Sequence, residues 1–208
     1  MAEAVDSLIA DLHAEADRDR PEAVRPEVGI VMGSDSDLDV MYGAHQALTD
    51  LGFAELTNYD NPPEARYTFE TYVVSAHRTP DLMYAYAETA RDRGLDIIIA
   101  GAGGKSADLP NMTASIAYPL PVVGVPVQEK SVDSVLGMPT GAPITAVDAG
   151  KSYNAALSAV QTLARTHGDL EERLIELHER RQQGVGEVSR ELHETGTQAF
   201  RDRRGGSE

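Results

Sequence analysis

Short apolar runs between residues 28 and 147 constrain the fold of this chain more than any other feature. They cover residues 28–32, 97–100 and 122–125, with another at 73–74 and the positions before it, and a weaker one at 144–147. Runs that are apolar at every position are typical of strands buried on both faces. Such strands form parallel sheets, which need helices on both sides.

Helical patterns occupy the stretches between these runs. Residues 38–51 carry one apolar stripe with helical spacing, and similar stripes cover residues 83–90 and 153–164. The alternation of strands and helices predicts an α/β protein, a three-layer α/β/α sandwich with a flavodoxin-like parallel sheet. Ligands of such sheets bind beyond the carboxyl ends of the strands, so functional residues are expected in the loops that directly follow each strand.

The two ends of the chain lie outside this predicted core. We expect an acidic N-terminal extension (1–27) with a short helix, a flavodoxin-like domain (28–167), and a C-terminal helical extension with a polar tail (168–208). Residues 54–68 contain Asn61-Pro62-Pro63 and predict a loop. The C-terminal extension predicts one amphipathic helix after Gly168 and a further one around residues 185–192, before the polar tail. An apolar stripe on such a helix must pack on its own domain or on a neighbouring subunit.

The charge of the chain excludes several classes of partner. Its net charge is −16, from 34 acidic and 18 basic residues. A field of this sign repels nucleic acid and anionic membranes, so neither is expected as a partner. No apolar run approaches the ~20 residues needed to span a bilayer, and the acidic first 25 residues do not resemble a signal peptide, so a cytoplasmic location is expected. The absence of cysteine excludes disulfides, thiolate metal sites and a cysteine nucleophile.

Lysine is scarce among the basic residues: the only lysines are Lys105, Lys130 and Lys151. Abundant Asp and Glu with little Lys is typical of proteins adapted to concentrated salt, where screening suppresses self-repulsion; an ordinary acidic protein is the alternative. We expect the melting temperature to rise between low and molar potassium chloride. A thermal melting series measures this, and a melting temperature that stays constant across the series would contradict salt adaptation.

The loop after the first strand is Gly33-Ser34-Asp35-Ser36-Asp37. Ser and Asp are good helix N-caps, which is a purely structural explanation. Hydroxyls and the free N–H groups of a helix start can also bind a phosphate. Because two carboxylates beside a phosphate are repulsive, at least one of them is expected to serve another purpose, such as accepting hydrogen bonds from ribose hydroxyls.

The loop after the second strand is Ser75-Ala76-His77-Arg78-Thr79-Pro80. The guanidinium of Arg78 can bind phosphate through two N–H groups and offset the nearby aspartates. An imidazole can give and take protons near neutral pH, which makes His77 a candidate for proton transfer. The alternative is a solvated or capping histidine.

The loop after the third strand contains Gly101, Gly103 and Gly104, and such small residues let a flat ligand approach the backbone closely. A flexible loop is the structural alternative. The spacing of a Walker phosphate loop is absent, and no Gly-x-Gly-x-x-Gly follows the first strand, which argues against a dinucleotide enzyme. The other histidines look structural, and no pair has convincing metal-ligand spacing, so no metal site is predicted.

Taken together, these loops resemble those of the N5-carboxyaminoimidazole ribonucleotide mutases. The resemblance covers roughly residues 28–180, in family order, and the Ser-Ala-His-Arg-Thr-Pro string is its most specific part. The other matching strings are 33–37, 100–104, Leu109-Pro110-Asn111-Met112, 124–127, 138–143 and 154–157.

The resemblance implies a step of purine biosynthesis without a cofactor. The carboxylate of N5-carboxyaminoimidazole ribonucleotide is lost as carbon dioxide and recaptured at C4, giving 4-carboxy-5-aminoimidazole ribonucleotide. By family analogy His77 carries the protons, Ser34 and Arg78 bind the phosphate, and Asp37 binds the ribose. A homo-octamer is implied, with an ATP-dependent carboxyaminoimidazole ribonucleotide synthetase as metabolic partner. The other residues expected to bind substrate are Ser36, Ser75, Ala76, Gly101, Gly103, Gly104, Lys105, Ser106 and Leu109.

One stretch departs from the family pattern. Bacterial mutases usually carry Ala-Ala-His-Leu-Pro-Gly-Met after the glycines, whereas residues 105–112 here are one residue longer and lack the second histidine. Gly104-Lys105-Ser106 is similar to the Gly-Arg-Ser of related carboxylases that take free carbon dioxide, although those typically have Lys where Arg78 stands. We favour the mutase. The alternatives are aminoimidazole ribonucleotide carboxylase and a non-catalytic nucleotide- or flavin-binding module on the same scaffold.

Overall fold

The computed structural model describes residues 2–21 and 24–205. Within these residues one parallel sheet of six strands has the order β2-β3-β1-β4-β5-β6. Its central strand β1 pairs with β3 on one side and with β4 on the other, so the loops after these three strands meet at one edge. The strands are β1 (Val28–Met32), β2 (Ala54–Glu55), β3 (Thr68–Val73), β4 (Ile97–Ala102), β5 (Val122–Pro126) and β6 (Thr145–Ala146).

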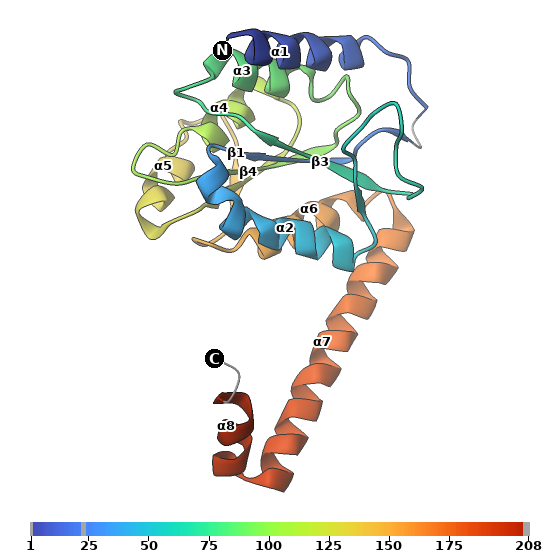
Figure 1. The fold of residues 1–208 in the computed structure, drawn as a ribbon, viewed down its shortest axis with the longest axis vertical. Helices are drawn as coiled ribbons and strands as arrows, with labels where there is room; N and C mark the ends of the chain where they lie inside the picture. Colours follow the sequence, from blue (N-terminus) through green and yellow to red (C-terminus); the bar gives the residue numbers. More distant parts are fainter. Residues whose placement is uncertain (1, 22–23, 206–208) are drawn as a thin grey trace.

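Helices cover both faces of the sheet, which confirms the three-layer architecture (Figure 1). One face carries α3 (Pro80–Thr89) and α4 (Leu109–Ile116). On this face α1 (Ala2–Ala16) packs against α3, and α5 (Val132–Leu136) contacts α4. The other face carries α2 (Leu38–Asp50) and α6 (Ser152–Leu163). Two short 3-10 turns, η2 (Asp35–Asp37) and η3 (Glu129–Ser131), lead into α2 and α5.

Alternating side chains of the central strands build a core on each face. In β1, Ile30 belongs to the cluster that includes Met41 and Leu48 of α2, whereas Val31 belongs to the cluster that includes Leu82 of α3. These five side chains are at most 3% exposed. Full burial of each such side chain stabilises the fold by roughly 1.5–3 kcal/mol, so the core fixes the position of the strand ends.

Two predicted loops contain regular structure. The expected loop 54–68 begins with the edge strand β2, which pairs with the first residues of β3; two residues are too few to display a period-2 pattern. The expected loop 101–112 contains the end of β4 and the start of α4, whose first turn holds Pro110. Proline is well tolerated in the first turn of a helix, so it begins α4 and does not interrupt it.

The C-terminal extension forms one long helix where two were predicted. This helix, α7 (Gly168–Thr195), continues through Gly184 and Gly186 and projects away from the body. Leu170 and Leu177 are buried against the body, whereas Val185 is 71% exposed. Part of the predicted polar tail forms α8 (Thr197–Gly205), which folds back beside the end of α7; residues 206–208 lie outside the described residues.

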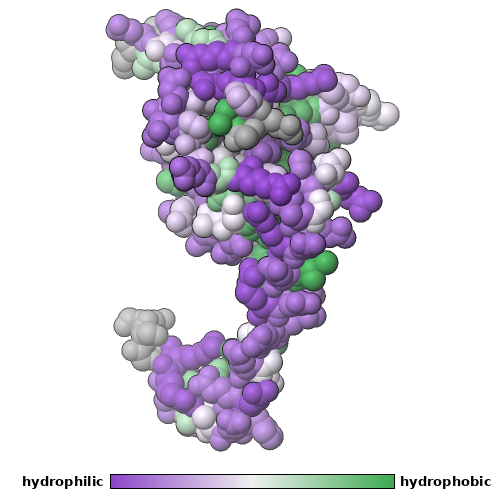
Figure 2. Space-filling model, turned by 90° about the vertical axis from the view of Figure 1, so that its right-hand side faces the viewer, coloured by the Kyte–Doolittle hydropathy of each residue, from purple (hydrophilic) through white to green (hydrophobic). Residues whose placement is uncertain are grey.

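The surface of the molecule is predominantly hydrophilic in the view of Figure 2, with a hydrophobic patch where α7 leaves the body. Among the described residues, no helix combines the length and the apolar character needed to cross a membrane.

Candidate functional site

A polar cleft of about 480 Å³ opens where β1, β3, β4 and β5 end. It brings together eleven of the thirteen residues predicted from the strand-end loops, together with five that were not predicted. The cleft is lined by Gly33, Ser34, Ser36, Asp37, Ser75, Ala76, His77, Arg78, Ala102, Gly103, Gly104, Ser106, Asp108, Leu109, Gln128 and Lys130.

The loop after β3 is held in shape by hydrogen bonds between its own residues. The N–H of Ser75 donates to the Thr79 hydroxyl at 2.9 Å. The N–H of Thr79 donates back to the Ser75 carbonyl, also at 2.9 Å. The Ser75 hydroxyl accepts from the N–H of Arg78 at 3.2 Å. These bonds fix the backbone on both sides of His77 before α3 begins at Pro80.

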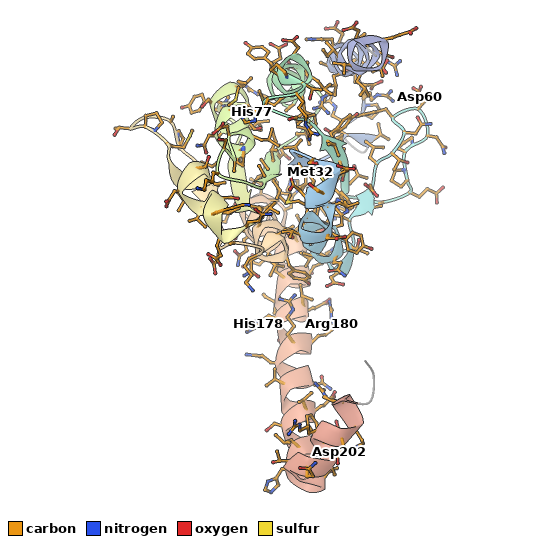
Figure 3. The ribbon with its side chains drawn as sticks, turned by 60° about the vertical axis from the view of Figure 1, so that its left-hand side comes forward. Met32, Asp60, His77, His178, Arg180 and Asp202 are labelled. Carbon is orange, nitrogen blue, oxygen red and sulfur yellow. The ribbon has the colours of Figure 1, made fainter. Side chains whose placement is uncertain are left out.

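The imidazole of His77 lies against a carboxylate from the next strand-end loop. Its Nε2 atom is 3.0 Å from Oδ2 of Asp108, at the start of α4. The two side chains are 60% and 44% exposed, so a substrate in the cleft can reach the ring. His77 lies in the body of the molecule, remote from His178 and Arg180 on α7 (Figure 3). A reachable imidazole with one nitrogen paired to a carboxylate can exchange protons with a bound molecule.

Arg78 connects the loop after β3 to the loop after β1. Its Nη2 donates to the Gly33 carbonyl at 2.9 Å. A guanidinium has five N–H donors in a fixed plane, so further donors remain for an anion in the cleft. The bond also shows that the two loops with the predicted phosphate-binding residues share one cleft.

The two aspartates of the loop after β1 have different environments. This difference agrees with the expectation that they do not both face a bound phosphate. Asp35 is exposed and does not line the cleft; the hydrogen bond from the Ser34 hydroxyl, at 2.9 Å, lowers the pKa of its carboxyl. Asp37 lines the cleft and is 7% exposed. Burial raises the pKa of Asp37, while the N–H groups of Ser34, Gly33 and Gly103 counteract the rise. Asp37 can therefore accept hydrogen bonds from a ligand hydroxyl.

Glycine allows the third loop to lie close to this carboxylate. A Cβ atom at Gly103 would come within 3.1 Å of Oδ1 of Asp37. Gly104 has a φ of +86°, a left-handed conformation that side chains other than glycine rarely adopt. Replacing either glycine would disturb the wall of the cleft.

Two predicted site residues do not line the cleft. Gly101 lies inside β4, where the absence of a side chain makes room for Met41 of α2. Its role is therefore packing between sheet and helix. Lys105 is exposed and is not among the residues that line the cleft.

Sequence reasoning missed some residues that line the cleft, notably Asp108, Gln128 and Lys130. Gln128 and Lys130 follow β5, so the rule that ligands bind beyond strand ends could have found them. Gln128 also accepts a hydrogen bond from the N–H of Gly104 at 3.4 Å. Lys130 adds a second cation to the lining that contains Arg78, and both suit an anionic ligand.

The other candidate sites of the described structure lie away from the strand-end loops. A groove of about 520 Å³ between α6 and α7 is slightly larger than the cleft, and its lining combines apolar side chains such as Leu174 and Ile175 with charged ones such as Glu171 and Arg181. Because it contains none of the strand-end loops, we place the functional site in the cleft. Within the described residues, no group of three or more His, Asp or Glu side chains is arranged to hold a metal ion.

Fold and cleft define a flavodoxin-like α/β protein with cationic and acidic groups at the switch point of its sheet. The family model for AIR carboxylase matches residues 27–184, and the chain belongs to this family. It is 42% identical over 188 residues to the N5-carboxyaminoimidazole ribonucleotide mutase of Mycobacterium tuberculosis, covering 88% of this chain and 99% of the relative. For the mutase of Bacillus subtilis the identity is 45% over 177 residues, covering 81% and 99%.

Solved structures show the same fold. The crystal structure of Treponema denticola PurE matches with a TM-score of 0.64 at 22% identity, covering 81% of this chain and 99% of that chain. This likeness confirms the flavodoxin-like fold predicted from the sequence, and the family model and the curated relatives confirm the family resemblance.

Proposed function

We propose that this protein converts N5-carboxyaminoimidazole ribonucleotide to 4-carboxy-5-aminoimidazole ribonucleotide in purine biosynthesis. One observation carries the proposal: the same cleft is lined by Asp37 from the loop after β1, by His77 and Arg78 from the loop after β3, and by small residues of the loop after β4. A proton carrier, an anion-binding guanidinium and a hydroxyl-binding carboxylate match the base, phosphate and ribose of a nucleotide. The names of the relatives support this substrate.

Each group in the cleft has a distinct role in this proposal. Ser34 and Arg78 bind the phosphate, assisted by Ser36 and Ser75, and Asp37 accepts hydrogen bonds from the ribose hydroxyls. The small residues Gly103, Gly104 and Ser106, with Leu109, cover the aminoimidazole, and Ala76 also contributes to the lining around it. Lys130, which also lines the cleft, adds positive potential for the phosphate.

The reaction needs one proton carrier and a closed space. His77 donates a proton to the exocyclic nitrogen as the bond from nitrogen to the carboxylate carbon breaks and carbon dioxide leaves. The C4 carbon then forms a bond to the carbon dioxide, and His77 takes the proton from C4, which restores its initial state. General acid–base catalysis of this kind contributes about 10²–10⁴-fold in rate. Confinement of the small fragment beside C4 supplies the rest.

Further expectations follow from membership of this pathway. We expect assembly into a homo-octamer, which would give the apolar side chains of α7 a neighbouring subunit to contact. We also expect the protein to act in the cytoplasm after an ATP-dependent carboxyaminoimidazole ribonucleotide synthetase, which supplies the unstable carbamate.

The close alternative is direct carboxylation of aminoimidazole ribonucleotide by free carbon dioxide, which the Gly104-Lys105-Ser106 string favours. The exposed Lys105 does not line the cleft, and Arg78 is typical of the mutases, so we favour the mutase. Initial rates on the two nucleotides at low bicarbonate test the choice. The carbamate nucleotide should react faster, without added ATP or metal. Faster turnover of the unmodified nucleotide would reject the mutase assignment.

A further inference from the structure

Asp108 holds the imidazole of His77 with one oxygen and is itself held through the other. Its Oδ2 lies 3.0 Å from Nε2 of His77, and its Oδ1 accepts a hydrogen bond from the Ser134 hydroxyl at 3.3 Å. Both oxygens of the carboxylate therefore have a partner. The three residues come from separate parts of the chain: the loop after β3, the start of α4, and α5.

The support of this carboxylate is part of the folded framework. Asp108 is the N-cap residue of α4, and its carbonyl accepts from the N–H of Met112 at 3.0 Å. The side chain of Asn111, in the first turn of α4, donates to the Ser134 carbonyl at 2.6 Å. Two hydrogen bonds thus join α4 to α5, and they fix the carboxylate beside the imidazole.

We infer that Asp108 is a positioning residue for the proton transfer by His77, an inference that rests on the proposed function. A carboxylate accepts hydrogen bonds, so the neutral ring keeps its proton on Nε2 and presents the lone pair of Nδ1. The proton is then given up from Nδ1 in the first transfer and taken back there in the second, and the carboxylate balances the charge of the imidazolium before the first transfer and after the second. Both side chains are substantially exposed, so solvent weakens the charge effect, and orientation of the ring is the main contribution.

The test is Asp108→Asn in the full chain, because this change keeps the shape and removes the charge. We expect kcat on the carbamate nucleotide to fall about 10- to 100-fold, the scale for a misplaced catalytic group. KM and the melting temperature should stay close to those of the parent. Asp108→Glu restores the carboxylate and should recover part of kcat. Asp133→Asn, an exposed neighbour of Ser134 on α5, is the matched control and should retain full turnover.

Nitrogen-15 NMR of the labelled histidine ring measures which ring nitrogen carries the proton, and a mere loss of packing would not change this tautomer. In the parent protein the neutral ring of His77 should carry its proton on Nε2, and in Asp108→Asn the two tautomers should mix. Unchanged kcat in Asp108→Asn, or the same tautomer in both proteins, would overturn the inference. If the parent itself fails to turn over the nucleotide, the proposed function fails, and the tautomer comparison still decides whether Asp108 positions the ring.

Discussion

His77→Asn should lower kcat on N5-carboxyaminoimidazole ribonucleotide by about 10²–10⁴-fold, the usual contribution of one acid–base group. Asparagine retains a polar side chain of similar reach but cannot carry a proton at neutral pH. Because Arg78 and Asp37 line the cleft independently of the ring, the nucleotide should still bind. Steady-state kinetics and calorimetric titration of the product nucleotide measure the two effects separately.

The matched control is His193→Asn, which removes an exposed histidine from the last turn of α7 and should not change kcat. If this protein were a non-catalytic nucleotide- or flavin-binding module, His77→Asn would change no measurable property. A variant that keeps the turnover of the parent would therefore reject an enzymatic role for His77.

The second large effect concerns stability, because a buried ion pair anchors the sheet. Arg93 donates to Glu70 of β3, and their side chains are 0% and 1% exposed. Arg93 also donates to the Tyr59 hydroxyl at 3.0 Å and to the Tyr86 carbonyl at 3.2 Å. Burial alone would lower the pKa of Arg93, but the neighbouring Glu70 carboxylate and the two tyrosines together have the larger effect and raise this pKa above its ordinary value. The pair links the loop 57–67, the sheet and the segment after α3.

Arg93→Met should lower the free energy of unfolding by about 3–5 kcal/mol, because it leaves the Glu70 carboxylate buried without its cationic partner. Urea unfolding followed by circular dichroism measures the loss. The double variant Arg93→Met with Glu70→Met should recover most of it, because two apolar side chains then replace the ion pair. Equal losses in the single and double variants would mean that the unpaired charge is not the cause.

The fold could be predicted because its determinants are local in sequence. The strands β1, β4 and β5 are apolar at nearly every position, and their neighbours carry helical stripes. The edge strand β2 could not be found, because two residues carry no periodic signal and its pairing depends on β3. The continuity of α7 through Gly184 and Gly186 also could not be predicted, since each glycine costs a helix about 1 kcal/mol and suggests an interruption.

The part of the candidate site that lies in the loops after the strands could be predicted from the sequence. His77, Arg78 and Asp37 directly follow strands, so topology alone places them at one edge. The contact between His77 and Asp108 depends on how the loop after β4 turns, which no spacing in the sequence reveals. The burial of Glu70 was also hidden, because a charged residue within a strand normally indicates an exposed position.

The cleft is lined by residues from the loops that follow β1, β3, β4 and β5, between Gly33 and Lys130, so no single loop contains a working set. Parallel strands that are distant in sequence must all be joined before these loops meet, and such long-range pairing is slow compared with helix formation. During refolding from denaturant, the return of turnover therefore marks completion of the whole sheet, whereas the ellipticity of an outlying helix such as α7 can recover beforehand.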